Sequence, residues 1–431
     1  MGGLLLGVVT AVSVHPAAVY ASLSAPYSIA PGQTAASSSI TDTITGTLYL
    51  PLLFVPPAPD PLPPPLILSG TPPIDFTAVQ LELRQEGLSL GFSKLGFHAG
   101  PGGNPTGLVD SLYQLDAAGV PFVVKSVDTL TGVYEAQLIM RQSDIPHIAI
   151  FRRSIVPPGA NPPPSGNPDV PDYGKSPADA AFEHWQWHKA HFPAELDPAL
   201  TWVETVNEVD KNRAEWLALF ALETAQLALA DGYKWAAFGW STGEPEPAHW
   251  QSPAMLAFLR FAAARPNQVA IALHEYSLTV DQITRWYPYL VGRFQFLFMI
   301  CDQHNIPRPT VLITEWGWEA VHVPDVAAAM EDLAWASWLY AAYPEVKGAA
   351  IWYLGPGFDG IADQAQRLIA PLMDYSRSHY FGVTPGRGRI DPSLFAPVTP
   401  TWLYERFAGN AKRDAVLAHD FKPLFFARLE P

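Results

Sequence analysis

Two glutamates stand where apolar, β-branched stretches of the sequence end. Glu208 follows Asn207 at the end of the run 200–208, and Glu315 lies 107 positions further on (315 minus 208), near the end of the run 309–316. Hydrolysis of a glycosidic bond needs two carboxyl groups, one that protonates the leaving oxygen and one that attacks the anomeric carbon or activates water. Two glutamates at the ends of different strands would supply such a pair, with each role set by the local environment.

The elements that would position these glutamates alternate along the chain. Short apolar runs rich in β-branched and aromatic residues are each followed by a longer segment with helical periodicity. Ser176-Pro177 and Ser252-Pro253 are typical helix starts. The predicted strands are 89–97, 121–127, 146–152, 200–207, 233–240, 268–276, 309–316 and 347–354. The predicted helices are 108–119, 130–142, 177–191, 211–230, 253–264, 280–304, 325–342 and 361–378.

Eight strand–helix units predict a closed barrel, because parallel strands need a crossover helix between them. The turn after the first strand, 97–103, is Gly-rich but does not open directly into a helix as a dinucleotide-binding GxGxxG turn does. The expected fold class is therefore α/β, a single (β/α)8 barrel with a Pro-rich N-terminal extension. In such barrels the carboxyl ends of the strands carry the catalytic residues, which is where Glu208 and Glu315 fall.

Four of these strands carry motifs that resemble the glycoside hydrolase clan A superfamily, whose members are retaining (β/α)8 glycosidases. The resemblance spans about residues 89–380 and singles out no family within the clan. The matching motifs are Asn207-Glu208 on the fourth strand, His274-Glu275-Tyr276 on the sixth, Thr314-Glu315-Trp316-Gly317 on the seventh and Ala350-Ile351-Trp352-Tyr353 on the eighth.

The resemblance implies the roles of the matching residues. Glu208 would be the general acid/base and Glu315 the nucleophile, with Tyr276 hydrogen-bonded to Glu315. Asn207 would contact the sugar 2-hydroxyl. His274 and Trp352 would complete the substrate site, Trp352 as a platform under the sugar ring.

One position departs from the clan pattern. Many clan members have an arginine on the second strand, near the nucleophile, where this chain offers only Lys125. Arg152 or Arg153, on the third strand, would take its place.

Further aromatic and imidazole side chains lie at predicted strand ends. Indole rings stack on the C–H faces of sugars, so Trp240, Trp316 and Trp318 are candidate platforms, whereas the tryptophans inside predicted helices are expected in the core. His98, at the end of the first strand, is expected to line the same pocket.

The other carboxylates have plainer interpretations. Glu204, inside a strand, is expected in a structural ion pair, and Glu275 is expected to face the helices. Glu244 would contact a sugar hydroxyl or simply begin a loop. Glu319 is the alternative nucleophile.

No cofactor or metal is predicted. His184, His188 and His191 share one helix face, but no HExxH pattern or acidic ligand accompanies them. The single cysteine, Cys301, excludes an intramolecular disulfide and is expected to be buried. A formal net charge of −15 argues against nucleic acid as a partner, whereas a neutral carbohydrate carries no such penalty.

The N-terminal part of the chain indicates where the protein is located and where its catalytic domain begins. An apolar run over 3–14 followed by small residues predicts a secretory signal peptide in 1–21, although no Lys or Arg precedes the run. Residues 22–75, rich in Ser, Thr and Pro, would form a linker or an arm packed along the barrel, and 76–431 would form the catalytic domain. We expect a secreted or cell-surface protein with no membrane span.

The Pro-rich loop 155–175 would either wall the substrate cleft or merely decorate the barrel.

Together these features predict a retaining glycoside hydrolase that cleaves β-glycosidic bonds in a poly- or oligosaccharide. The alternatives are a sugar-binding barrel without catalysis and a structural cell-surface protein. The sequence does not reveal the sugar, the linkage or the oligomeric state.

Overall fold

The computed structural model describes residues 61–278, 280 and 283–395. The predicted signal peptide and most of the predicted linker lie outside this range, so secretion stays a prediction. Within the described residues, no helix combines the length and the apolar character that a bilayer crossing would need.

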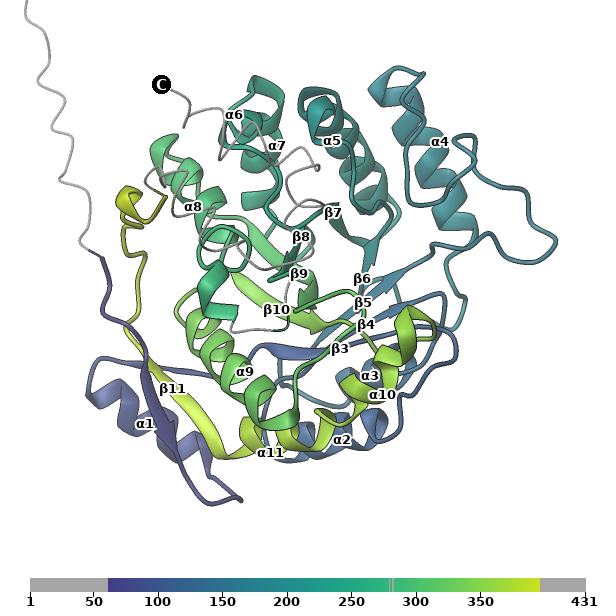
Figure 1. Cartoon of the computed structure of the whole chain (residues 1–431). Coiled ribbons are helices and arrows are strands. Elements are labelled where there is room, and N and C mark those ends of the chain that lie inside the picture. The colour runs from purple at the N-terminus through teal and green to yellow at the C-terminus, as the bar shows by residue number, and fades with distance from the viewer. Residues whose placement is uncertain (1–60, 279, 281–282, 396–431) are drawn as a thin grey trace, which may run out of the picture. The chain divides into compact units, whose positions relative to one another are not determined.

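Eight parallel strands close into a barrel in which each strand pairs with the next along the chain and the last pairs with the first (Figure 1). The predicted (β/α)8 fold is therefore confirmed. The strands are β3 (Leu95–Ala99), β4 (Val123–Val127), β5 (Ile148–Arg152), β6 (Thr201–Glu204), β7 (Lys234–Trp240), β8 (Val269–Tyr276), β9 (Thr310–Gly317) and β10 (Val346–Ile351).

Helices follow the barrel strands and pack outside them. They are α2 (Leu108–Ala117), α3 (Val133–Met140), α4 (Pro177–Ala190), α5 (Ala214–Ala230), α6 (Pro247–Trp250), α7 (Pro253–Ala263), α8 (Phe294–Gln303), α9 (Val326–Ala341), α10 (Ile361–Gln366) and α11 (Ile369–Ser378). As expected, the side chains of Ser176 and Ser252 cap α4 and α7, each with proline in the first turn.

Two predicted elements are wrong in extent. The predicted helix 280–304 is reduced to a short 3-10 turn, Ile283–Trp286, and α8. Pro288 and Gly292, whose φ is +85°, lie between them and do not fit a continuous helix. The predicted strand 89–97 is two strands, of which only β3 belongs to the barrel.

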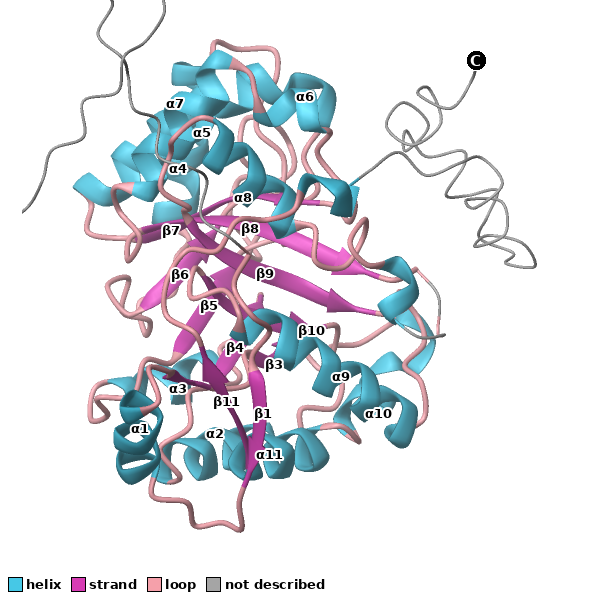
Figure 2. Ribbon diagram, turned by 90° about the vertical axis from the view of Figure 1, so that its left-hand side faces the viewer, coloured by secondary structure: helices cyan, strands magenta, loops and turns pink. Residues whose placement is uncertain are grey.

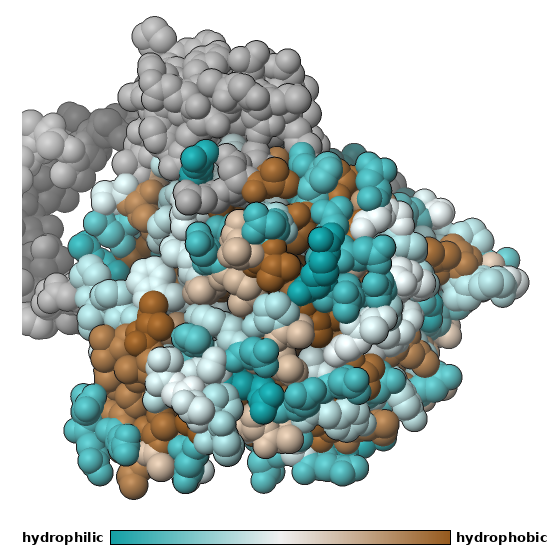
Figure 3. Space-filling view, turned by 60° about the horizontal axis from the view of Figure 1, so that its bottom comes forward, coloured by the Kyte–Doolittle hydropathy of each residue, from teal (hydrophilic) through white to brown (hydrophobic). Residues whose placement is uncertain are grey.

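A small antiparallel sheet lies beside the barrel, in the order β1 (Leu66–Ser69), β11 (His379–Val383) and β2 (Ser89–Gly91). In chain order α1 (Phe76–Gln85) links β1 to β2. β1 belongs to the segment predicted as linker or arm, so at least residues 66–69 are paired with the folded part of the chain. Figure 3 shows hydrophobic side chains gathered at the lower left. Leu66 and Ile67 on β1 and Leu81 on α1 are exposed.

The barrel interior has an apolar layer below a polar one. Side chains alternate in and out along a strand, and the inward apolar residues are Ile150, Trp202, Ala236, Ala270, Ala272 and Leu312. Two positions further along β5, β6 and β8 the inward residues are Arg152, Glu204 and His274, all buried. The polar layer therefore lies at the carboxyl ends of the strands, toward which the arrowheads of β8 and β9 point in Figure 2.

Gly96 is required for the close approach of β3 to β4. A Cβ at this position would lie 1.8 Å from the carbonyl oxygen of Val123, which is fixed in the neighbouring strand. We expect Gly96→Ala to destabilise the protein by roughly 4 kcal/mol or more, since the clash is with backbone. Gly159→Ala is the matched control, because a Cβ at Gly159 would have no atom within 4 Å and only the positive φ opposes the change. Thermal unfolding checks this, and a Gly96→Ala protein as stable as the control would contradict the stated packing.

Candidate active site

A β-bulge turns Glu315 into the barrel. Leu273 of β8 pairs with Ile313 of β9, but the next residue, His274, pairs with Glu315, so Thr314 is an extra residue in β9. A bulge of this kind re-aims the side chains that follow it. Thr314 points inward, since its hydroxyl donates to Glu204 at 2.7 Å, and Glu315 also points inward instead of facing the helices.

Glu208 is held at the barrel rim by backbone contacts from two neighbouring segments. Its N–H donates to the Gly239 carbonyl at 2.8 Å, and the Asn207 N–H donates to the Asp169 carbonyl at 3.0 Å. Glu208 has a φ of +46°, and Gly239 on β7 has a φ of +53°. A Cβ on Gly239 would lie 2.9 Å from the Val206 carbonyl oxygen, so the approach of these two segments depends on glycine.

One imidazole bridges the two glutamates. Nδ1 of His274 lies 3.5 Å from Glu208 Oε1 and 3.5 Å from Glu315 Oε2. These two oxygens can therefore be no more than twice 3.5 Å, or 7 Å, apart. Retaining glycosidases have carboxyl groups about 5–5.5 Å apart and inverting ones about 6.5–9.5 Å, and this bound on one pair of oxygens is compatible with the retaining geometry.

Glu315 is surrounded by donors and cations. Tyr276 donates its hydroxyl to Oε2 at 2.8 Å, while Arg152 and Lys125 lie 3.3 and 3.5 Å from Oε1. Burial alone would raise the pKa of Glu315, but His274, Lys125 and Arg152 together lower it below its usual value. The buried carboxyl group is therefore ionised at neutral pH. The contact with Tyr276 is the one that the clan resemblance implies.

Glu208 is in a different environment. Half of its side chain is exposed, and Oε1 accepts a hydrogen bond from Ser241 at 3.0 Å. Interaction with His274 lowers the pKa of Glu208 to about 2, outweighing its partial burial, and Ser241 acts in the same direction. A general acid needs a raised pKa, so without substrate Glu208 is in the form that can accept a proton.

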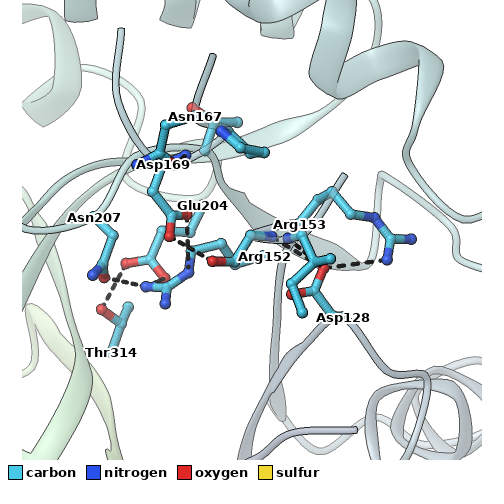
Figure 4. Close-up of polar contacts among 12 residues, drawn as sticks. Asp128, Arg152, Arg153, Asn167, Asp169, Glu204, Asn207 and Thr314 are labelled. Atoms are coloured by element: carbon cyan, nitrogen blue, oxygen red, sulfur yellow. Dashed lines mark hydrogen bonds and ion pairs between the residues drawn. The ribbon is translucent and has the colours of Figure 1, made fainter. Parts of the chain in front are cut away.

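A buried ion network forms the floor beneath Glu315. Lys125 and Glu204, both fully buried, form an ion pair at 2.6 Å, and Arg152 lies 3.6 Å from the same Glu204 oxygen. Figure 4 shows Arg152 between Glu204 and Asp169, which lies 3.5 Å from its Nε. The ion pair expected for Glu204 is thus present, with Lys125 as its closest cation.

Of the two arginines considered as replacements, only Arg152, the last residue of β5, reaches Glu315. Its NH1 also donates to the side-chain oxygen of Asn207, which leaves the Asn207 amide nitrogen free of this contact. Arg153 turns away and pairs with Asp128 at 3.3 Å, as Figure 4 shows.

The Pro-rich loop 155–175 reaches the site through Asp169. Asp169 accepts from Ser154 at 2.5 Å through its side chain and from Asn207 through its carbonyl. The preceding carbonyl, of Pro168, lies 2.9 Å from His188 Nε2 on α4. The loop is therefore tied to the barrel beside Asn207. The sequence alone assigned no role to Asp169 or to Ser241, since each is a polar residue in a loop with no motif around it.

Among the predicted sugar platforms only Trp352 keeps a partly exposed ring. It is half-buried and lies 5.1 Å, ring centre to ring centre, from Phe358, which is 43% exposed. The prediction for Trp240 and Trp316 is wrong, because both are fully buried on the outer face of the barrel, as is Trp318. Side chains alternate between the two faces of a strand, and the indole rings at these positions point outward and pack against the helices.

His98 lies beneath the candidate platform Trp352. It faces the barrel interior but is completely buried under Trp352 and Tyr353, whose ring centres lie 5.0 and 5.3 Å away. Burial, with the nearby charges of Lys125 and Arg152, lowers the pKa of His98 well below its usual value. It therefore packs against Trp352 as a neutral ring.

The remaining candidates lie away from the two glutamates. Glu319 is hydrogen-bonded to His322 at 2.7 Å, and Glu244 forms an ion pair with Lys211 at 3.2 Å. Glu275 faces the helices as expected and accepts hydrogen bonds from the backbone N–H of Gly292, at the start of α8.

The three clustered histidines bind carbonyl groups instead of one another. His184 and His188 each lie 2.9 Å from a backbone oxygen, of Thr205 and Pro168, and His191 lies 2.7 Å from that of Trp187. Within the described ranges no group of three His, Cys, Asp or Glu could hold a metal ion.

Comparison with known proteins gives fold neighbours only. The chain matches no protein-family model and no curated protein. Among solved structures, an endo-β-1,4-glucanase variant from Xanthomonas axonopodis pv. citri is 14% identical, with 66% of this chain and 99% of that chain covered and a TM-score of 0.37. Cel5A from Hypocrea jecorina is 11% identical, with 61% and 89% covered and a TM-score of 0.35. A dipeptide epimerase from Enterococcus faecalis also matches, at 12% identity, with 66% and 67% covered and a TM-score of 0.25.

These likenesses are too distant to say anything about the reaction. The (β/α)8 barrel is established by the strand pairing of the chain itself. What the chain shares with the two glucanases is at most this architecture, which hosts many unrelated activities.

Proposed function

We propose that the chain is a retaining glycoside hydrolase acting on β-linked sugars, with Glu315 as nucleophile and Glu208 as acid/base. The observation that carries the proposal is the shared position of Glu208 and Glu315 around His274 in two unlike environments. One carboxyl group is buried among cations, and the other is half exposed at the rim. Double displacement needs this division of roles.

The first step uses the ionised Glu315. Lys125, Arg152 and Tyr276 hold its carboxylate charged and fix its orientation. One oxygen attacks the anomeric carbon, the bond to the leaving oxygen breaks, and a glycosyl-enzyme ester forms. Because the donors are already in place, little reorganisation is needed as charge moves off the carboxylate.

Glu208 must carry a proton when the leaving oxygen departs. Its pKa of about 2 in the free protein has to rise on substrate binding. A sugar seated on the exposed half of Glu208 removes water from that carboxyl group, and desolvation raises the pKa of an acid. In the second step the ionised Glu208 takes a proton from water as the water oxygen attacks the anomeric carbon, and the bond from that carbon to Glu315 breaks, which frees both the sugar and the carboxylate.

The substrate contacts follow from the residues around the pair. Asn207 is oriented by Arg152, so its amide nitrogen is available to donate to a sugar hydroxyl. The half-buried ring of Trp352 offers a flat apolar surface to the C–H face of a pyranose.

A catalytically inactive sugar-binding barrel is the second candidate. The observation in its favour is the low pKa of Glu208, which disfavours a proton donor in the free protein. Turnover separates the two functions, since both use the same binding residues but only the hydrolase releases product.

The first prediction concerns the nucleophile. Glu315→Ala should reduce turnover of activated aryl β-glycosides by roughly 10,000-fold or more, because the covalent route is lost. Added azide should restore part of the rate and give a product of inverted anomeric configuration. Product release is followed by absorbance and the configuration by NMR.

Glu319→Ala is the matched control for that experiment. It removes a glutamate four positions away that is bound to His322, so activity should stay near that of the unmodified protein. Full activity in Glu315→Ala, or loss confined to Glu319→Ala, would transfer the role to Glu319.

The second prediction concerns pH. His274 lowers the pKa of both Glu208 and Glu315. His274→Ala removes this stabilisation of the two carboxylates, so both pKa values rise and both limbs of the kcat/KM profile should move to higher pH. His322→Ala, outside the pair, should leave the profile where it is. A profile unchanged by His274→Ala would mean that the imidazole does not interact with either group in solution.

The third prediction concerns the ion network. Lys125→Met leaves the fully buried Glu204 without its closest cation and should cost about 3–5 kcal/mol of folding free energy. Adding Glu204→Gln removes the uncompensated charge, so the double variant should regain part of the stability. It should not regain activity, because Glu315 still lacks the Lys125 charge. Denaturant unfolding and kcat, measured on all three variants, test this, and additive losses in stability would contradict it.

A further inference from the structure

A cavity lies at the end of the barrel opposite to Glu208 and Glu315. Its volume is about 690 Å³, within the range of about 300–1,000 Å³ that small-molecule sites occupy. Residues at the amino ends of the strands line it, among them Val123, Ile148 and Trp202, together with residues 383–386 after β11. The arrowheads of β8 and β9 in Figure 2 point away from this end.

The walls of the cavity are largely apolar. They are formed by side chains from the small sheet, from the loops that enter the barrel strands and from the lowest layer of the barrel. The large apolar residues in the lining include Leu90, Phe92, Phe122, Met140, Leu200 and Trp202. Apolar walls of this kind take up a hydrocarbon body with a gain of about 25 cal/mol for each Å² removed from water.

The charges in the lining are all of one sign. Lys94, Lys234 and Lys347 line the cavity, and no Asp or Glu among the described residues does. The chain as a whole has 41 acidic and 26 basic residues, so a lining with three lysines and no carboxylate departs from its general balance. An anion would meet a local field opposite to that of the molecule.

The three ammonium groups have no carboxylate of the described residues within 4.0 Å. Lys94 donates to the carbonyls of Tyr340 and Tyr343 at 2.9 and 2.7 Å, near the end of α9, and Lys347 donates to that of Pro344 at 2.7 Å. Lys234 lies 5.6 Å from the ring centre of Trp202. An ammonium group has three donors, so donor capacity remains on each of them.

The pKa values of these lysines are lowered, as expected for buried ammonium groups that lack a close counter-charge. Burial and the neighbouring Lys347 lower the pKa of Lys94 to about 7, although Glu345 opposes the shift. Burial also lowers the pKa of Lys234 and of Lys347, against weaker opposing effects of Asp197 and Glu345 respectively. A bound anion beside Lys94 and Lys347 would raise the pKa of both ammonium groups.

We propose that this cavity is a second binding site, which takes an amphipathic carboxylate: a hydrocarbon body in the apolar walls with its carboxylate beside Lys94 and Lys347. The site is independent of the hydrolase chemistry. The apolar layer that includes Ile150, Ala270 and Leu312 separates it from the polar layer around Glu315. A ligand here touches the amino ends of several barrel strands at once, and it therefore stabilises the folded barrel by mass action.

Octanoate, used below its micelle concentration, is the probe, and octan-1-ol is the neutral control of equal chain length. Isothermal titration calorimetry and thermal unfolding of the full chain measure binding. Octanoate should bind at least tenfold more tightly than octan-1-ol and should raise the unfolding temperature. Absence of octanoate binding, or equal binding of both probes, overturns the proposal.

Variants locate the site. Lys347→Met should weaken octanoate binding at least tenfold, whereas Lys189→Met, on the outer helix α4, should leave it unchanged. Lys94 is left in place because it binds the end of α9. Octanoate binding should also weaken between pH 6 and pH 9, since Lys94 loses its proton there while the carboxylate stays ionised. Unchanged affinity in Lys347→Met, or equal affinity at both pH values, contradicts the assigned cavity.

Discussion

The contact between Lys125 and Glu204, buried beneath Glu315, is the constraint on which the candidate site depends. A lone cation could not be held at full burial, because its desolvation would cost several kcal/mol. Glu204 compensates it at 2.6 Å, and Arg152 and Asp169 extend the same network toward the loop 155–175. Two positive groups can therefore stay under Glu315 and lower its pKa, although burial alone would raise that pKa.

Local departures from regular strand geometry place the carboxyl groups of Glu208 and Glu315 above this buried ion network. The extra residue in β9 directs both Thr314 and Glu315 inward, so that one strand supplies a member of the floor and the proposed nucleophile. On the other side, the positive φ of Gly239 brings β7 close enough to fix the backbone of Glu208. A regular barrel would alternate its side chains strictly and would leave Glu315 facing the helices.

The sequence predicts the barrel and the two glutamates because both depend on local patterns. Apolar runs and helical periodicity reveal the strands and helices, and Glu208 and Glu315 stand next to recognisable neighbours. It mispredicts Trp240 and Trp316, since the face on which a residue near a strand end lies depends on bulges that the sequence does not announce. The choice of Arg152 over Arg153, and the part played by Asp169, depend on contacts between distant loops. The lysine-lined cavity likewise joins residues from all parts of the barrel.

The most direct test of the central claim is to trap the covalent intermediate. A 2-deoxy-2-fluoro-β-glycoside with a good leaving group forms a glycosyl-enzyme that hydrolyses slowly, because the fluorine disfavours the positively charged transition state of the second step. Peptide mapping by mass spectrometry of the inactivated protein identifies the labelled residue. The account predicts one sugar per chain, attached to Glu315, with inactivation that follows the extent of labelling. Label on another residue, or turnover of matched substrates without any covalent label at Glu315, would contradict it.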